Sequence, residues 1–385
     1  MRCTPEARAA ALQAIDERNL RRRRTPAEDG RVNFCSNDYL GLARDPAVAA
    51  AMAEAAQRYG AGAGASHLVS GHGAEHEALE RELAEFTGRA RALVFSTGYM
   101  ANLGVLAAFA GRDDLLLADE LNHASLIDAV RLVRSPRSFR YPHGDGTAAR
   151  ALLDTHGTIG PGDAADTGAF LITDGVFSMD GDLAPLPALA AAAQAHGAWL
   201  VVDDAHGIGV VGATGGGCCE HFGLDAQAVP VLVGTFGKAL GTFGAFVAGD
   251  DDDIELLIQR ARPYIYTTAL PPPVAAATRR ALRIVSEEPW RRESLQDRIA
   301  QFREGAGRRG LAVSPSTTPI QPLILGTESA ALTASHRLAE AGYRVTAIRP
   351  PTVPVGTARL RITLSAAHTA QQVEGLLAAL EAALA

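Results

Sequence analysis

Short apolar runs alternate with amphipathic stretches over the first two thirds of the chain. The apolar runs lie at 91–96, 114–119, 169–174, 198–203 and 229–235. Stretches with apolar residues at helical spacing lie at 46–58, 74–87, 99–109 and 187–196. Strands without a polar face that alternate with helices are typical of a mainly parallel sheet covered by helices on both faces. This part of the sequence therefore predicts an α/β domain.

The two ends of the chain have a different pattern. Residues 5–24 predict an amphipathic helix, and a short strand with a turn is expected at 32–42. The proline cluster at 270–277 marks a change of region, and the helices and strands predicted after it favour a smaller α+β domain. We therefore expect three parts: an N-terminal segment at 1–45, a large α/β domain at 46–270 and a small C-terminal domain at 271–385.

Composition excludes several classes of protein. A hydrophobic fraction of 47% in 385 residues allows large cores and excludes global disorder. The net charge of −7 argues against a nucleic-acid binder, so the basic run at 21–24 is interpreted as a solvated helix end. The four cysteines lack paired metal spacing, and no signal peptide or apolar run of membrane-spanning length is present. We expect a cytoplasmic protein without a metal site.

One lysine stands out among the charged residues. Of the 36 Lys and Arg residues, only Lys238 is a lysine. Arginine keeps its proton and forms no imine, so a lysine retained against this background indicates amine chemistry. Lys238 follows the predicted strand at 229–235, at the edge where α/β sheets bind their ligands. We therefore expect a functional lysine rather than a surface residue.

Other polar residues follow predicted strands at the same edge. Asp203 ends the strand at 198–203, His206 comes three residues later, and His123 follows the strand at 114–119. The turn at 96–99 joins a strand to a helix, where free backbone N–H groups can hold a phosphate. Each signal is weak alone, because an aspartate at a strand end can merely cap a turn and strand-to-helix turns are common.

A competing motif follows Asp203. Residues 207–212 match the G-x-G-x-x-G pattern of dinucleotide-binding folds. Such a site needs a helix that opens at the motif, whereas the loop sequence GATGGGCCE follows here. A nicotinamide site is therefore not expected.

Arginines alternate with apolar residues near the C-terminus. Arg359 and Arg361 share one face of the strand predicted there. This face is either a plain solvent face or a guanidinium fork for a carboxylate. The pattern by itself leaves both interpretations open.

Together these motifs resemble those of the α-oxoamine synthases, enzymes that use pyridoxal 5'-phosphate (PLP). The matching segments are TFGK around Lys238, VVDDAHGIGVVG around Asp203 and GVFSMDGDLAPL at 175–186, and the resemblance covers nearly the whole chain. It implies PLP-dependent transferase fold type I, which is aspartate aminotransferase-like. That fold has a large domain with a mainly parallel sheet and a smaller C-terminal α+β domain.

The resemblance also implies roles for individual residues. Catalytic roles are implied for Lys238 as the Schiff-base lysine, Asp203 as partner of the pyridinium nitrogen and His123 stacked on the ring. Cofactor contacts are implied for Gly98, Tyr99, Ser178, Asp203, His206, Thr235, Lys238 and Thr268, and substrate contacts for Arg21, His123, Thr352 and Arg361. Thr268 resembles a position that reaches the phosphate of a neighbouring subunit, which implies a homodimer with shared active sites.

The segment at 346–369 is most similar to the family member that acts in biotin biosynthesis. It implies an acyltransferase that condenses L-alanine with pimeloyl-CoA or a pimeloyl-acyl-carrier protein, with loss of carbon dioxide. One alternative is a related synthase that uses glycine and a short acyl-CoA. Another is a non-catalytic partner subunit on the same fold, against which the retained Lys238 argues. The sequence does not decide between the two acyl carriers, and no nucleic-acid or membrane partner is expected.

Overall fold

The computed structural model describes residues 4–22, 24, 26, 30–157 and 167–385. They form two compact units. The larger comprises Asp38–Ser178 and Asp182–Glu293, and the smaller comprises the residues up to Asn37, Met179–Gly181 and Ser294–Ala385. Within the described ranges, no helix combines the length and apolar character needed to cross a bilayer.

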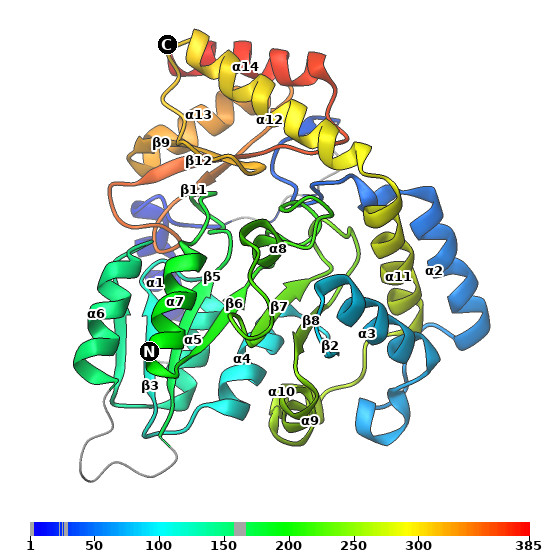
Figure 1. Ribbon diagram of the computed structural model, residues 1–385. Helices are drawn as coiled ribbons and strands as arrows, with labels where there is room; N and C mark the ends of the chain where they lie inside the picture. Colours follow the sequence, from blue (N-terminus) through cyan, green and yellow to red (C-terminus); the bar gives the residue numbers. More distant parts are fainter. Residues whose placement is uncertain (1–3, 23, 25, 27–29, 158–166) are drawn as a thin grey trace. The chain divides into compact units, whose positions relative to one another are not determined.

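A seven-stranded sheet forms the centre of the larger unit (Figure 1). Its strand order is β2-β8-β7-β6-β5-β3-β4. The strands are β2 (Arg91–Phe95), β3 (Leu115–Asp119), β4 (Ser138–Tyr141), β5 (Ala169–Asp174), β6 (Trp199–Asp203), β7 (Val231–Thr235) and β8 (Ala245–Gly249). The five strands from β7 to β4 are parallel, whereas β8 is antiparallel to both its neighbours. The predicted mainly parallel sheet is confirmed, although β4 and β8 were not among the predicted strands.

Helices pack against this sheet and against one another. They are α2 (Pro46–Tyr59), α3 (Ala74–Thr87), α4 (Gly98–Phe109), α5 (Ala124–Val133), α6 (Gly146–His156), α7 (Leu186–His196), α8 (Cys218–Phe222), α9 (Asp251–Arg260), α10 (Arg262–Ile265) and α11 (Pro272–Glu287). Helix α4 packs on α5 and α9, α6 on α7, and α11 on α2 and α3. Strands β3, β5, β6 and β7 contribute Leu116, Ile172, Val201 and Val233 to the core, which explains their almost uninterrupted apolar sequences.

The smaller unit contains a three-stranded antiparallel sheet in the order β11-β12-β9. Its strands are β9 (Ile320–Gly326), β11 (Thr346–Ile348) and β12 (Ala358–Thr363), and a separate parallel pair joins β1 (Val32–Asn33) to β10 (Tyr343–Arg344). The helices are α1 (Pro5–Glu17), α13 (Glu328–Glu340), α14 (Ala370–Leu384) and most of α12 (Trp290–Arg308).

The predicted first helix is too long. Helix α1 ends at Glu17, and Asn19 adopts a left-handed conformation with φ of 54°. Asparagine tolerates that conformation better than most residues, so it lets the chain leave the helix. The interpretation of the basic run at 21–24 as a helix end is therefore wrong, because Arg21, Arg22 and Arg24 lie beyond the end of the helix.

Candidate active site

Parallel strands bring four polar side chains to one edge of the seven-stranded sheet. Asp119, Asp174, Asp203 and Thr235 are the last residues of β3, β5, β6 and β7. Asp174 and Asp203 are register partners on adjacent strands, and both are buried, with 4% and 5% of their surface exposed. Two buried carboxyl groups side by side need hydrogen-bond donors or a proton.

Helix α4 orients the Asp203 carboxylate. Asn102 donates its amide to Asp203 Oδ2 at 2.6 Å and to Ser125 Oγ at 2.8 Å. The other oxygen, Oδ1, accepts the backbone N–H of Ala205 at 3.0 Å. Asp203 therefore caps the turn after β6 and still presents a buried, oriented negative group. Sequence reasoning missed Asn102, whose signal was a polar residue inside the apolar stretch YMANLGVLAAF.

Asp174 supplies a second, neutral acid. Burial, and then the neighbouring Asp203, raise the pKa of Asp174 well above its ordinary value. Its Oδ2 accepts the backbone N–H of His123 at 2.6 Å, and its own N–H donates to Asn122 Oδ1 at 3.0 Å. A protonated Asp174 spares the site the repulsion of two adjacent carboxylates. It also anchors the turn that presents His123.

His123 begins helix α5 as its N-cap residue. Its Nδ1 lies 2.7 Å from Ser125 Oγ. Although the residue is exposed, desolvation by the surrounding protein lowers the pKa of His123; Asp203 opposes this shift and Lys238 adds to it. The three groups therefore lie within electrostatic range of one another. A neutral imidazole suits packing against a flat aromatic ring.

His206 is buried beside Tyr39, with 2.7 Å between Nδ1 and the phenol oxygen. The loop that carries His206 is held by Asp204, whose Oδ2 accepts the backbone N–H of Cys218 at 2.6 Å. Burial raises the pKa of Asp204 to about 7. A Cβ at Gly207 would collide with the Asp204 carboxylate, so this turn requires glycine. Residues 207–212 form turns and bends, and no helix opens there, so the dinucleotide pattern is not matched by the structure.

Lys238 lies in the turn between β7 and β8 and is half-buried. The Thr235 hydroxyl donates to the Gly244 carbonyl at 2.9 Å, and the Phe236 N–H donates to the same carbonyl at 2.9 Å. The Lys238 carbonyl accepts the Gly241 N–H at 2.9 Å. These bonds fix the backbone on both sides of the lysine.

Helix α4 begins at the same edge. Its N-cap residue, Thr97, accepts the Met100 N–H at 3.2 Å, and a Cβ built at Gly98 would meet no atom within 4 Å. The helix start therefore leaves room for an anion. Tyr99 is exposed, and its hydroxyl donates to Asp128. Ser178 is half-buried and Thr268 is exposed.

The donor set of the larger unit fits PLP. A buried carboxylate suits a pyridinium N–H, and a buried imidazole suits a phenolic oxygen. An open helix start suits a phosphate, and a lysine amine suits an aldehyde. Asp203 and His206 supply two of these groups from one segment, and Gly98 and Lys238 supply the others from segments remote in the sequence.

The other expected site residues belong to the smaller unit. Both β12 arginines are buried, Arg359 with 3% and Arg361 with 7% exposed, so the solvent-face interpretation is wrong. Arg359 forms an ion pair with Asp180 at 2.5 Å, whereas Arg361 donates to the Asn37 side-chain oxygen at 3.1 Å. A carboxylate neutralises Arg359. Arg361 contacts an amide oxygen and also acts electrostatically on the Cys35 thiol.

Arg21 and Thr352 have different polar partners: Asp16 for Arg21 and Arg22 for Thr352. Arg21 is exposed and forms an ion pair with Asp16 at 2.5 Å. Its neighbour Arg22 donates to Thr352 Oγ1 at 3.1 Å. Arg22, Thr352 and Arg349 line a cavity of about 250 Å³. Burial, and then the nearby Arg22, lower the pKa of Arg349. Sequence reasoning named Arg21 as a substrate contact and did not identify Arg22 or Arg349 as candidate site residues.

Comparison with known proteins matches this geometry. The family model for aminotransferase class I and II matches residues 29–380. An 8-amino-7-oxononanoate synthase from Methylococcus capsulatus is 58% identical over 97% of both chains. One from Pseudomonas aeruginosa is 57% identical over 90% of this chain and 84% of its own.

Solved structures agree with this match. A structure of SPT with PLP has a TM-score of 0.89 at 30% identity and covers 98% of this chain and 96% of its own. An 8-amino-7-oxononanoate synthase from Francisella tularensis has a TM-score of 0.78 at 31% identity, over 92% of this chain and 98% of its own. The chain therefore belongs to the class I and II aminotransferase family and, within it, to the group of the 8-amino-7-oxononanoate synthases.

Proposed function

We propose that the protein is a PLP-dependent acyltransferase that makes 8-amino-7-oxononanoate for biotin biosynthesis. It joins L-alanine to a pimeloyl thioester with loss of the alanine carboxylate and release of the thiol. The observation that carries this proposal is the only lysine of the chain, on the sheet edge that also carries Asp203, His206 and His123. The identity of 58% to a curated synthase supports the choice of reaction.

Bound PLP supplies an electron sink for the Cα carbanion of the amino acid. Lys238 would hold the cofactor covalently and then carry the Cα proton. Asp203, oriented by Asn102, would keep the pyridine nitrogen protonated. His206, held by Tyr39, would donate to the phenolic oxygen, supported by Ser178. His123 would pack on the ring face.

The remaining polar groups would hold anions. Backbone N–H groups at Gly98 and Tyr99, together with Thr235, would bind the cofactor phosphate. Arg361 would bind the amino-acid carboxylate, because its guanidinium is buried and Asn37 orients it. Bidentate binding of a carboxylate is the geometry that guanidinium favours.

The far carboxylate of the pimeloyl group needs a cation of its own. Arg21 is already paired with Asp16. Arg22 and Arg349 form no ion pair within the described residues, and they lie close enough for Arg22 to lower the pKa of Arg349. Glu328 also acts electrostatically on Arg349, but burial and then Arg22 affect its pKa more strongly. Two neighbouring guanidinium groups of this kind favour an anion between them. We therefore assign this carboxylate to Arg22, Arg349 and Thr352.

Matched variants test this assignment. Arg22→Gln and Arg349→Gln should each raise the KM for pimeloyl thioester roughly ten-fold or more, the scale of one hydrogen bond to a charged group. Arg21→Gln is the control and should have a small effect. An uncharged heptanoyl thioester should be used equally by all three variants. Loss of pimeloyl selectivity in the Arg21 variant alone would return the role to Arg21.

The reaction itself is tested with purified protein, PLP, several amino acids and several thioesters, with the product identified by mass spectrometry. L-alanine with pimeloyl-CoA or pimeloyl-acyl-carrier protein should give 8-amino-7-oxononanoate. One methyl group in a small pocket is worth about 1–3 kcal/mol, so alanine should be preferred over glycine by a ratio. Preference for glycine with a short acyl-CoA would support the alternative synthase. No product with any pair, although PLP binds, would support the non-catalytic alternative.

A homodimer and a cytoplasmic location belong to the same proposal. Thr268 is exposed in the single chain. A residue that contacts a second subunit must be exposed before the subunits assemble, so this exposure supports the proposal. Sedimentation should show a dimer, and Thr268→Ala should weaken PLP binding. An active monomer would contradict the shared site.

A further inference from the structure

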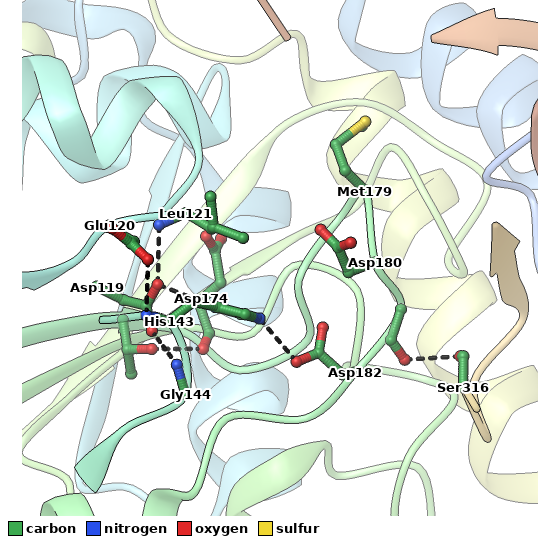
Figure 2. A network of polar contacts seen from close by, with 12 residues as sticks. Asp119, Glu120, Leu121, His143, Gly144, Asp174, Met179, Asp180, Asp182 and Ser316 are labelled. Carbon is green, nitrogen blue, oxygen red and sulfur yellow. Dashed lines mark hydrogen bonds and ion pairs between the residues drawn. The ribbon is translucent and has the colours of Figure 1, made fainter. Parts of the chain in front are cut away.

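His143 lies between two aspartates at the edge of the sheet that carries the site (Figure 2). Its Nδ1 is 3.1 Å from Asp119 Oδ1, and its Nε2 is 2.9 Å from Asp182 Oδ2. Phe177 packs edge-on against the imidazole, with ring centroids 4.3 Å apart. None of these residues has a role in the proposed reaction.

Both ring nitrogens of His143 face carboxylate oxygens, which only an imidazolium can satisfy by donating from both. The hydrogen bonds to Asp119 and then Asp182 raise the pKa of His143 to about 10, against the opposing effect of burial. A third acid lies beside the ring, because Glu120 accepts the backbone N–H of His143 at 3.2 Å. The ring is therefore a cation at neutral pH.

Asp119 holds the turn that leads to His123. Its Oδ1 accepts the Leu121 N–H at 2.9 Å, and its Oδ2 accepts the Gly144 N–H at 2.8 Å. The carboxylate is almost inaccessible, with 1% of the residue exposed. A buried carboxylate of this kind depends on a partner cation, and His143 is that partner.

Asp182 belongs to a different segment, the hairpin that carries Ser178. The Asp182 carbonyl accepts the Phe177 N–H at 3.0 Å, and the Ala184 N–H donates to Gly175 at 3.0 Å. These bonds close the hairpin around Ser178. One imidazolium therefore links this hairpin to the turn before His123.

We propose that His143 is a positioning residue for the cofactor site, because its ring ties the segment of His123 to the segment of Ser178. The proposal rests on the cofactor contacts assigned to these two residues under the proposed function. Without the ring, two acids would face each other, and both segments would lose a common anchor. PLP would then bind less tightly and in a less defined orientation.

The test compares His143→Asn with a matched control. His196 also bridges an acid and another acceptor, with Nε2 2.8 Å from Asp154 and Nδ1 2.9 Å from the Ala192 carbonyl, but it lies at the far end of α7. PLP is titrated into each apoprotein, and visible circular dichroism is recorded at saturation. His143→Asn should weaken PLP binding roughly ten-fold or more and change the dichroism, on the scale of lost charge-assisted bonds. His196→Asn should leave both unchanged.

Asp182→Asn is a second variant for the case in which His143→Asn does not fold. Asp182 is partly exposed, and its substitution leaves the Asp119–His143 ion pair in place. It should give a smaller change of the same kind. Nitrogen NMR of the wild type should show both His143 nitrogens protonated at pH 8. If the variants lower thermal stability while affinity and dichroism match the control, His143 is purely structural and the proposal fails. If wild-type apoprotein binds no PLP, it is the proposed function that fails.

Discussion

The hydrogen bond from Asn102 to Asp203 offers a sharp test of the site. Asn102→Ala removes the donor and leaves the Asp203 carboxylate in place. Both residues are buried, with 1% and 5% exposed, so bulk water does not readily replace the lost amide. The bond is short, at 2.6 Å, and its acceptor is a carboxylate, so it belongs to the stronger, charge-assisted class. Asp203 should therefore lose orientation and part of its ability to hold a proton on the cofactor.

The expected size follows from the charge on the acceptor. A hydrogen bond to a charged group contributes about 1.5–3 kcal/mol, which corresponds to roughly 10- to 150-fold in kcat/KM. The loss of folding stability should be smaller than this figure suggests. Within the described residues Asn102 Oδ1 accepts no hydrogen bond, so the substitution also removes an unsatisfied buried acceptor.

The assay is kcat/KM for product formation with L-alanine and pimeloyl thioester, together with thermal unfolding of the apoprotein. Gln321→Ala is the control, because Gln321 is another buried amide with an unpartnered oxygen, and it donates to the neutral carbonyls of Ser316 and Thr318. It should lose stability but little activity. Unchanged kcat/KM in Asn102→Ala would refute the role given to this bond.

Three further predictions concern single groups. Lys238→Arg keeps the positive charge but should abolish activity. Borohydride reduction should fix PLP to the wild type only, and peptide mass spectrometry should locate the PLP on Lys238. Burial raises the pKa of Glu80 to about 8, so the folded protein holds a proton that the unfolded chain releases near pH 4.5. Stability should therefore fall as pH rises between these values. Glu80→Gln keeps an acceptor for the Val94 N–H, and its advantage in melting temperature over the wild type should grow from pH 5 to 8; a constant difference would contradict the shift. Gly207→Ala should weaken PLP binding in an apoprotein titration, because its Cβ would displace Asp204 and the adjacent His206; unchanged affinity would show that the loop adapts.

Much of the architecture was readable from the sequence because buried parallel strands are apolar along their whole length. The runs that end at Asp119, Asp174, Asp203 and Thr235 follow this rule, and their common direction brings their last residues to one edge. Strand β8 was missed because its short run in GTFGAFVAG is broken by glycines and follows the lysine turn directly. The helix before the basic run was overextended, since a left-handed Asn19 leaves little trace in a hydrophobic pattern.

The sequence by itself determined the reactive amine, because Lys238 is the only lysine and arginine forms no imine. The tertiary structure alone decided which groups orient Asp203 and His206. Asn102 reaches Asp203 across 101 positions, and Tyr39 reaches His206 across 167. The tertiary structure also decided the polar partner of each arginine. Arg21 pairs with Asp16, Arg359 pairs with Asp180, and Arg361 donates to Asn37. Hydrogen bonds and ion pairs depend on distances of a few ångströms between residues that are remote in sequence, and residue patterns do not encode such distances.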